Sequence, residues 1–231
     1  MPQKNITLDA IFKWDVTNWS ESLAFWERNC GADFKGAKVL EIGSSLGGLS
    51  LWAASKNANV ICSDLTNPGE TAKSFHDQFS FSGSISYQAI DATNIPFENY
   101  FDIILFKSVL GGVGRDSHPE RQQKMIDEIY KALKAGGCLL FAENLKASFL
   151  HQYFRKKFVR WGTQWRYITI PEMTHYSAGK FELKYSSTGF WGAFGRSESQ
   201  RKFLSLFDKL IFNKLISQSA KYVLYGVARK V

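Results

Sequence analysis

The sequence predicts an α/β fold built on a doubly wound, mostly parallel sheet of seven strands. Short apolar stretches alternate with amphipathic ones as far as residue 144, which gives five strands separated by helices. This alternation is typical of a parallel sheet covered on both faces. Two more strand-like stretches follow late in the chain, and we expect an antiparallel C-terminal strand. A length of 231 residues with 45% hydrophobic residues suits a single domain.

The apolar patterns also give the order of the elements. Alternating or continuous apolar stretches predict strands at 37–43, 59–64, 84–91, 101–108, 136–144, 180–192 and 221–231. Helical spacing of apolar residues predicts helices at 11–29, 47–57, 69–80, 118–135, 147–160 and 198–215. Within the first helix Ser20 is a plausible N-cap, because Glu21 follows it in what would be the first turn.

We divide the chain into an N-terminal helical cap (1–34), a ligand-binding core (35–145) and a basic substrate-side helix with the C-terminal strands (146–231). The N-terminus has no apolar core of a signal peptide, and the apolar runs are too short to span a bilayer. Three cysteines lie far apart without the spacing of a zinc site. We therefore predict a cytoplasmic protein without a metal.

The charge is distributed unevenly along the chain. Residues 1–144 hold 13 Lys/Arg against 17 Asp/Glu, whereas residues 145–231 hold 16 against 4. This asymmetry indicates that the second part meets an anionic partner. A solvated basic surface without a partner is an equally good interpretation.

The turn in "VLEIGSSLGGLS", residues 39–50, follows the first predicted strand and points to a ligand site. It fits the dinucleotide fingerprint G-x-G-x-x-G only if Ser45 replaces a glycine. A carboxylate at the end of the strand, Glu41, would repel a pyrophosphate. It suits a cationic ligand such as S-adenosylmethionine, which carries a sulfonium and an ammonium group.

This stretch resembles the first motif of the class I S-adenosylmethionine-dependent methyltransferases, an acidic residue followed by x-Gly-x-Gly-x-Gly. Gly43 and Gly47 match the outer glycines, and Ser45 departs from the middle one. The resemblance covers roughly residues 35–145 and implies a Rossmann-like methyltransferase fold. It also implies S-adenosyl-L-methionine as cofactor and S-adenosyl-L-homocysteine as product, with Glu41 and the turn in the cofactor site.

Later strand ends supply the rest of the predicted cofactor site. Asp64, with Leu65 beside it, ends the second strand about 20 residues past the turn, where an acid can accept both ribose hydroxyls. The resemblance implies that Asp91, with Ala92 beside it, accepts a hydrogen bond from the adenine amino group. Lys107 follows the fourth strand and is added to this set. Ordinary turn, cap and surface roles are the alternatives for each residue.

Methyl transfer is an in-line displacement in which the protein mainly aligns the acceptor, and a hydroxyl acceptor also needs a general base. Glu143, at the end of the fifth strand, is the first candidate for that base. His118 and His151 are further candidates, although a lone histidine is more often structural. The tryptophans of the first helix, Trp14, Trp19 and Trp26, form either a lid over the site or a hydrophobic contact with the sheet.

A basic aromatic stretch at 149–167 bears on the acceptor. It interleaves Lys and Arg with Phe and Trp, which suits an anionic membrane surface, a phosphate-bearing substrate or RNA. A core-facing aromatic stripe with a solvated basic face is the alternative. The chain is also similar to bacterial methyltransferases of glycoconjugate synthesis. We expect methylation of a small-molecule or glycan-type acceptor, most plausibly on oxygen. An RNA methyltransferase and a non-catalytic cofactor-binding module are kept as alternatives.

Overall fold

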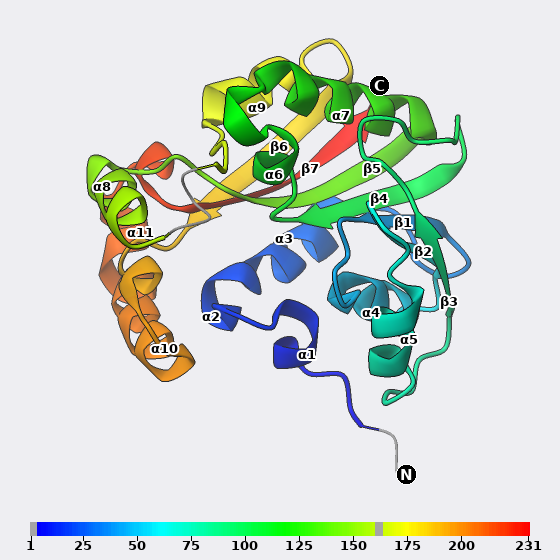
Figure 1. The fold of residues 1–231 in the computed structure, drawn as a ribbon, viewed down its shortest axis with the longest axis horizontal. Coiled ribbons are helices and arrows are strands. Elements are labelled where there is room, and N and C mark those ends of the chain that lie inside the picture. Colours follow the sequence, from blue (N-terminus) through cyan, green and yellow to red (C-terminus); the bar gives the residue numbers. More distant parts are fainter. Residues whose placement is uncertain (1–3, 160–163) are drawn as a thin grey trace.

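A computed structural model describes residues 4–159 and 164–231. Its center is one seven-stranded sheet in the order β3-β2-β1-β4-β5-β7-β6 (Figure 1). The strands are β1 (Lys38–Ile42), β2 (Asn59–Asp64), β3 (Ser84–Ala89), β4 (Phe101–Lys107), β5 (Leu133–Asn144), β6 (Phe181–Thr188) and β7 (Val223–Lys230). The predicted fold class is confirmed.

Helices cover both faces of the sheet (Figure 1). Those before β5 are α1 (Leu8–Phe12), α2 (Val16–Trp19), α3 (Glu21–Asn29), α4 (Gly48–Ser55), α5 (Gly69–His76), α6 (Leu110–Val113) and α7 (Pro119–Ala132), with a 3₁₀ turn η1 (Arg115–Ser117). Those after it are α8 (Phe149–Phe158), α9 (Ile170–Ser177), α10 (Glu198–Phe207) and α11 (Asn213–Leu215), with the turns η3 (Trp191–Phe194), η4 (Asp208–Phe212) and η5 (Gln218–Ala220).

The C-terminal strand lies inside the sheet rather than at its edge. β7 pairs antiparallel with both β5 and β6, so β7 alone runs against the other strands and β6 forms the edge. The expected late strand pair is therefore present, but the antiparallel strand is the inner member of it. Buried Val and Ala side chains let β7 pack on both faces in this central position.

The N-terminal prediction of one helix over 11–29 is wrong, since the segment forms three short helices. The backbone turns left-handed at Lys13 (φ 67°) and Asp15 (φ 45°), and a left-handed residue ends a helix. A distant carboxylate, Glu198, accepts hydrogen bonds from the backbone N–H groups of Asp15 (3.0 Å) and Val16 (2.8 Å). Ser20 makes no side-chain cap, and α9 was not predicted.

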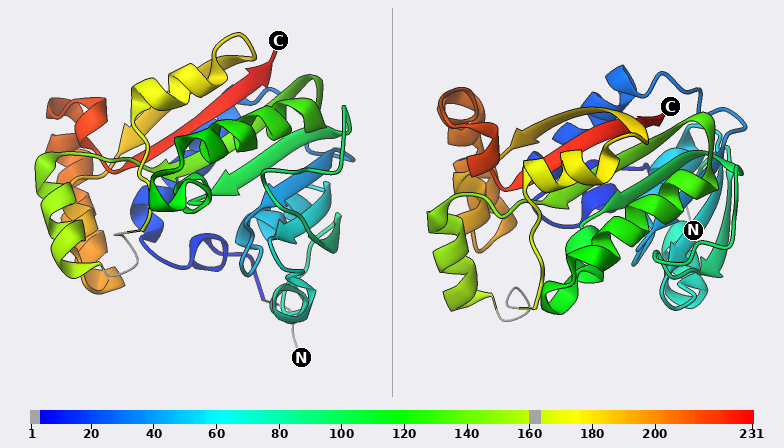
Figure 2. Two further views of the ribbon diagram at one scale, coloured as in Figure 1. Left: turned by 45° about the horizontal axis from the view of Figure 1, so that its top comes forward. Right: turned by 90° about the horizontal axis from the view of Figure 1, so that it is seen from above.

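Two apolar clusters flank the sheet, one on each face. Trp19 and Trp26 are completely buried in the cluster beneath α3 and α4, which supports the core interpretation for these two tryptophans. Trp14, in contrast, lies beyond the core. The helices α8, α10 and α11 lie together at one end of the molecule (Figure 1 and Figure 2). This end carries the larger cavity described below. Arg160 and Trp161, part of the predicted basic aromatic stretch, lie outside the described residues.

Candidate active site

The turn after β1 has the backbone shape that its residues predict. Gly43 (φ 63°), Ser45 (φ 52°) and Gly47 (φ 71°) all adopt left-handed conformations before α4 begins. A Cβ atom at Gly47 would come within 2.6 Å of the His76 ring, so a side chain does not fit there. Ser45 holds the same region without being glycine, which costs roughly 1 kcal/mol. The turn is therefore a strained and closely packed segment at the end of a strand.

Glu41 is buried beneath this turn. Its Oε2 accepts hydrogen bonds from Ser50, one from the backbone N–H (2.7 Å) and one from Oγ (2.5 Å). Burial raises the pKa of Glu41 to about 7, while the hydrogen bonds from Ser50 and the charge of Lys107 act in the opposite direction. Both bonds from Ser50 use the same oxygen, Oε2, and the backbone N–H of Leu49 also donates to this carboxylate.

A cavity of about 240 Å³ lies between the turn and the N-terminal segment. Glu41 and Lys107 both line it, together with residues 11–14 and 43–46. Burial lowers the pKa of Lys107 to about 8, and the carboxylates of Glu41, Glu143 and Asp15 offset part of this effect. Its Nζ lies 5.0 Å from the ring of Trp14 and 4.9 Å from that of Trp19. One cavity thus presents a carboxylate and an ammonium group, which suits the amino-acid end of a zwitterionic ligand.

The other predicted cofactor residues lie at neighbouring strand ends. Asp64 is hydrogen-bonded to two other predicted residues. Its Oδ2 accepts from the Ser45 N–H (2.9 Å), and its Oδ1 accepts from the Leu65 N–H (2.8 Å). Asp91 accepts two hydrogen bonds from Thr93 on Oδ1, and the Thr93 backbone N–H holds the pKa of this carboxyl below its usual range. Ala92 is buried, whereas the Leu65 side chain is exposed.

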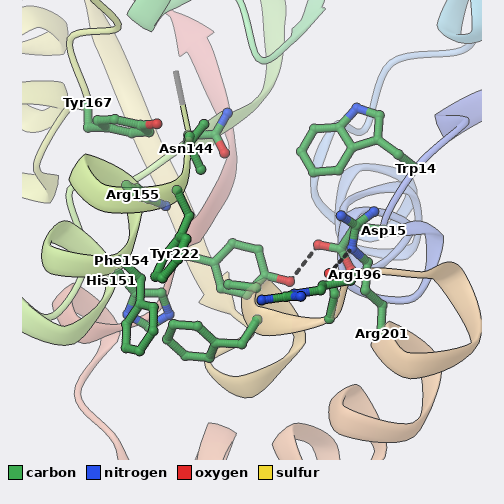
Figure 3. A pocket seen from close by; sticks show the side chains of 15 residues that line it. Trp14, Asp15, Asn144, His151, Phe154, Arg155, Tyr167, Arg196, Arg201 and Tyr222 are labelled. Atoms are coloured by element: carbon green, nitrogen blue, oxygen red, sulfur yellow. Dashed lines mark hydrogen bonds between the residues drawn. The ribbon is translucent and has the colours of Figure 1, made fainter. Parts of the chain in front are cut away.

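A second cavity, of about 580 Å³, adjoins the first and shares Trp14 with it. Its walls come from the N-terminal segment, the end of β5, α8, η3, α10 and Tyr222, which directly precedes β7 (Figure 3). Aromatic side chains and three arginines line it: Trp14, His151, Phe154, Phe158, Tyr167, Phe194, Tyr222, Arg155, Arg196 and Arg201. An aromatic and cationic lining of this kind suits an anionic acceptor with apolar faces.

A buried hydrogen-bond network forms one wall of this larger cavity. The Tyr222 hydroxyl donates to Asp15 Oδ2, and Asn18 Nδ2 donates to Asp15 Oδ1 (3.0 Å) (Figure 3). Asn18 Nδ2 also lies 2.6 Å from Ser205 Oγ. Burial raises the pKa of Asp15 to about 6 despite the hydrogen bonds from Tyr222 and Asn18. A carboxylate whose pKa lies near neutrality and that is linked to a cavity-lining hydroxyl can accept a proton.

The predicted base Glu143 is fully buried and lies away from both cavities. Its Oε2 accepts from the N–H groups of Val109 (2.8 Å) and Leu110 (2.7 Å), and its Oε1 accepts from Asn144 N–H (2.8 Å). Burial raises its pKa to about 7. These bonds fix the loop that follows Lys107, the last residue of β4. The geometry therefore gives Glu143 a positioning role, and its predicted role as a base gains no support.

The two predicted histidines differ in placement. His151 lines the larger cavity, but its Nε2 donates to the Phe190 carbonyl (2.9 Å) and its Nδ1 accepts from Ser148 Oγ (2.7 Å). Burial lowers its pKa to about 4, so the ring is neutral and both nitrogens are engaged. His118 is exposed, contacts Glu120 Oε1 at 2.6 Å, and lines neither cavity.

The basic aromatic stretch divides between two environments. Arg155 turns inward, stacks 4.1 Å from the centroid of the Tyr167 ring and donates to the Leu145 carbonyl (2.6 Å). Lys156 and Lys157, the next two residues, lie on the exposed side of α8. A further cavity of about 540 Å³ lies beyond Arg155 and Tyr167. Arg155 therefore forms part of the walls of both larger cavities and Lys156 contributes to the further one, whereas Lys157 lines neither of them.

Sequence reasoning missed the residues that carry the larger cavity. Asp15, Tyr222, Arg196 and Arg201 come from segments far apart in the chain. The one local signal was a carboxylate inside an aromatic cluster, "KWDVTNW" (13–19), where an acid is unexpected unless it has buried partners.

Comparisons with known proteins match the predicted ligand-binding core of the chain to a known domain. A family model described as a methyltransferase domain matches residues 40–141. No curated protein sequence matches the chain. Among solved structures, a SAM-dependent methyltransferase from Methanosarcina mazei has a TM-score of 0.63 at 16% identity, covering 89% of this chain and 96% of that one.

Two further structures were solved with the cofactor or its product. Phosphoethanolamine N-methyltransferase 2 of Haemonchus contortus, in complex with S-adenosyl-L-methionine, has a TM-score of 0.62 at 19% identity and covers 96% of this chain. The present chain spans only 56% of that enzyme. The N-methyltransferase NodS of Bradyrhizobium japonicum, with S-adenosyl-L-homocysteine, has a TM-score of 0.59 at 17% identity, covering 91% of this chain and 84% of that one. At these identities the structures establish a common fold.

Proposed function

We propose that this chain, whose residues 40–141 match a methyltransferase-domain model, is a class I S-adenosylmethionine-dependent methyltransferase that transfers a methyl group to a hydroxyl of an anionic small-molecule or glycan-type acceptor. The observation that carries the proposal is the pair of adjoining cavities. The smaller one is built from the glycine turn, Glu41 and Lys107, and the larger one is lined by aromatic rings and arginines. Trp14 is common to both.

The residues of the smaller cavity fit S-adenosylmethionine. Gly43 and Gly47 hold left-handed backbone at positions where a Cβ atom would clash with Val109 (2.5 Å) and His76 (2.6 Å), so glycine is needed for the turn that lines this cavity. Glu41 would meet the ammonium group and Lys107 the carboxylate of the methionine end. Asp64 would accept from the ribose and Asp91 from the adenine amino group. The cofactor supplies the sulfonium methyl and its own leaving group.

On the acceptor side the chain's residues align the nucleophile and take its proton. Arg196 and Arg201 attract the anionic group, and the aromatic walls exclude water. As the C–O bond forms and the C–S bond breaks, the acceptor's hydroxyl proton passes to the Tyr222 oxygen. The Tyr222 proton passes in turn to Asp15, to which it is already hydrogen-bonded. This relay leaves a methyl ether, S-adenosylhomocysteine and a protonated Asp15.

Titration calorimetry tests the cofactor half of the proposal. We expect S-adenosylmethionine and S-adenosylhomocysteine to bind and NADH not to bind. Glu41→Gln is the informative variant, because a glutamine oxygen can still accept both bonds from Ser50. Loss of the charge should weaken binding about tenfold. Glu27→Gln, a change at an exposed carboxylate of α3, is the matched control. Binding of NADH alone would overturn the assignment.

Incorporation of labelled methyl groups tests the acceptor half. The panel comprises sugar phosphates, nucleotide sugars, their neutral counterparts and RNA. We expect transfer to a phosphate-bearing member and little to its neutral counterpart, with the product resistant to mild base as an ether is. Methylation of RNA alone, or of an amine, would contradict the proposed acceptor class. Cofactor binding without turnover on any extract would favour a non-catalytic module.

A further inference from the structure

The segment from α10 through η4 to α11 has its amphipathic pattern reversed relative to the rest of the protein. Its apolar side chains face outward at helical spacing: Phe203, Leu206, Phe207, Leu210, Ile211 and Leu215. The most exposed of them are Phe203 (62%), Leu210 (63%) and Leu215 (77%). A helix on the surface of a globular protein normally turns such a stripe toward the core.

The inner side of the same segment is held by buried polar groups and by the Phe212 ring, which packs on Phe190 and Trp191. Ser205 and Asp208 are completely buried. Asp208 accepts hydrogen bonds from three successive backbone N–H groups, those of Phe190 (2.9 Å), Trp191 (2.8 Å) and Gly192 (2.9 Å). Ser205 contacts Asn18 in the network around Asp15. These bonds fix the helix with its apolar stripe facing away from the protein.

Lysine side chains flank the stripe. Lys202, Lys209 and Lys214 interrupt it, and the single carboxylate between residues 199 and 221 is the buried Asp208. Lys209 forms an ion pair with Glu21 at 2.6 Å, and Lys202 and Lys214 have no ion-pair partner among the described residues. α8 lies at the same end of the molecule (Figure 2). It carries the exposed side chains of Phe149, Tyr153 and Phe158 as well as the exposed Lys156 and Lys157.

We propose that the outer face of α10, η4 and α11, together with that of α8, docks on the surface of an anionic lipid bilayer. Exposed Phe and Leu side chains flanked by lysines are the combination that interfacial helices use, the apolar groups entering the bilayer boundary and the cations meeting the headgroups. Among the described residues no helix is both long and apolar enough to cross a membrane.

The charge of this surface favours an anionic bilayer over a second copy of the chain as its binding partner. A two-fold contact would place the same surface against itself. Lys202 and Lys214 of each copy would then approach those of the other, without carboxylates to offset them. An anionic bilayer complements the same charges. Both helices also border the larger cavity, to which Phe154, Phe158 and Arg201 contribute, so docking would bring that cavity beside the membrane.

Vesicle co-sedimentation tests the proposal and does not depend on methyl transfer. The wild-type protein is mixed with phosphatidylcholine vesicles with and without phosphatidylglycerol. We expect binding to the anionic vesicles that weakens as salt rises, because salt screens the headgroup charge. Phe203→Ser with Leu210→Ser and Leu215→Ser should reduce partitioning by about tenfold or more. The double variant Lys202→Glu with Lys214→Glu should reduce partitioning by about fivefold for each lysine replaced.

Two controls make the result decisive. Tyr185→Ser removes a half-exposed aromatic side chain on the edge strand β6 and should leave partitioning unchanged. Cofactor affinity should be unchanged in every variant, which shows that each is folded. Absence of binding to anionic vesicles at low salt would overturn the proposal. So would a wild-type dimer that the serine variants convert to a monomer while vesicle binding stays nil, since that result assigns the stripe to self-association.

Discussion

The two cavities of this protein are built in different ways. The smaller one depends on backbone conformation: left-handed residues at 43, 45 and 47, a buried carboxylate that holds the start of α4, and Asp64 bonded to the turn. The larger one depends on side chains from segments up to 207 residues apart, as in the Asp15–Tyr222 hydrogen bond. The first is set by geometry common to the fold, and the second by contacts particular to this chain.

This difference separates what the protein shares from what makes it specific. A turn at a strand end tolerates little change, because a side chain in place of Gly43 or Gly47 would clash with a neighbour. The walls of the larger cavity come largely from helices outside the sheet and from long side chains. Substitutions there can therefore change the walls without disturbing the sheet. Substitutions in the second region should change the acceptor chemistry while leaving the cofactor bound.

The largest difference between the two regions is expected for substitution of Asp15, which should lower turnover without affecting cofactor binding. Asp15→Asn should lower the turnover rate about 10²- to 10⁴-fold, the usual contribution of a general base, with cofactor affinity unchanged. Tyr222→Phe should behave similarly, since it removes the hydroxyl that passes the proton. Asp9→Asn, a change in the exposed first turn of α1, is the control. Turnover is measured with saturating cofactor, and affinity by calorimetry.

The pH–rate profile distinguishes a base from a merely structural carboxylate at this position. Asp15 accepts a proton only when it is ionised, and burial raises its pKa to about 6. Wild-type turnover should therefore fall as the pH drops through about 6. The residual activity of Asp15→Asn should lack this limb. A profile that keeps the limb in the variant, or a parallel loss of cofactor affinity, would remove Asp15 from the mechanism.

The cofactor region should control the dependence of stability on pH. Burial raises the pKa of Glu41 from 4.5 to about 7, so the folded state retains this proton longer than the unfolded state does. The corresponding stability is fully present below pH 4.5 and is lost as the pH rises through about 7. The difference amounts to at most about 3 kcal/mol. Urea unfolding at several pH values should show this decline and a flatter curve for Glu41→Gln.

Glu143 offers the comparison for that experiment. Burial raises its pKa to about 7 as well, so it contributes a decline of the same sign. Its two oxygens, however, accept from three backbone N–H groups. Glu143→Gln would set an amide N–H against one of them and should cost about 1–3 kcal/mol at every pH. Equal pH dependence in the wild type and in Glu41→Gln would contradict the assignment to Glu41.

A smaller effect is expected at Arg196, on the acceptor side. Its side chain reaches toward Tyr222 and Asp15 across the larger cavity (Figure 3). Arg196→Ala should raise the KM for an anionic acceptor about tenfold, since a charged hydrogen bond is worth roughly 1.5–3 kcal/mol. The control is Lys202→Ala, which removes a nearby cation outside the cavity. Equal KM values in the variant and the wild type would mean that Arg155 or Arg201, and not Arg196, binds the acceptor's anionic group.

The sequence predicts the two regions unequally, and the reason is physical. Strand ends and a left-handed turn are local features, so the positions of Glu41, Gly43 and Asp64 could be predicted from the apolar pattern and from the resemblance to the methyltransferase motif. The partners of Asp15 are fixed only when β7 enters the sheet beside β5, and no local pattern reports that pairing. Glu143 was correctly placed at a strand end, but its orientation toward three N–H groups depends on the loop after β4. A local sequence pattern therefore predicts where a residue lies within a strand or turn, whereas tertiary packing decides which groups its side chain contacts.

The smallest predicted effect lies within the glycine turn itself. Ser45 departs from the family motif and holds φ at 52°, a conformation that glycine adopts without strain. Ser45→Gly should raise the free energy of unfolding by about 0.5 kcal/mol, because relief of strain exceeds the added entropy of the unfolded chain. Ser44→Gly is the matched control, since Ser44 is not among the residues with positive φ. It should lower stability by a similar amount.

Together the two serine variants show whether the turn or the side chain matters at position 45. The hydrogen bond from Ser45 to Asp64 uses the backbone N–H, so glycine keeps it. Cofactor affinity should therefore be unchanged in Ser45→Gly, as measured by calorimetry. A clear loss of affinity with retained stability would mean that the Ser45 hydroxyl contacts the cofactor. The cofactor region would then contain a chain-specific contact as well, and its contrast with the acceptor region would be one of degree.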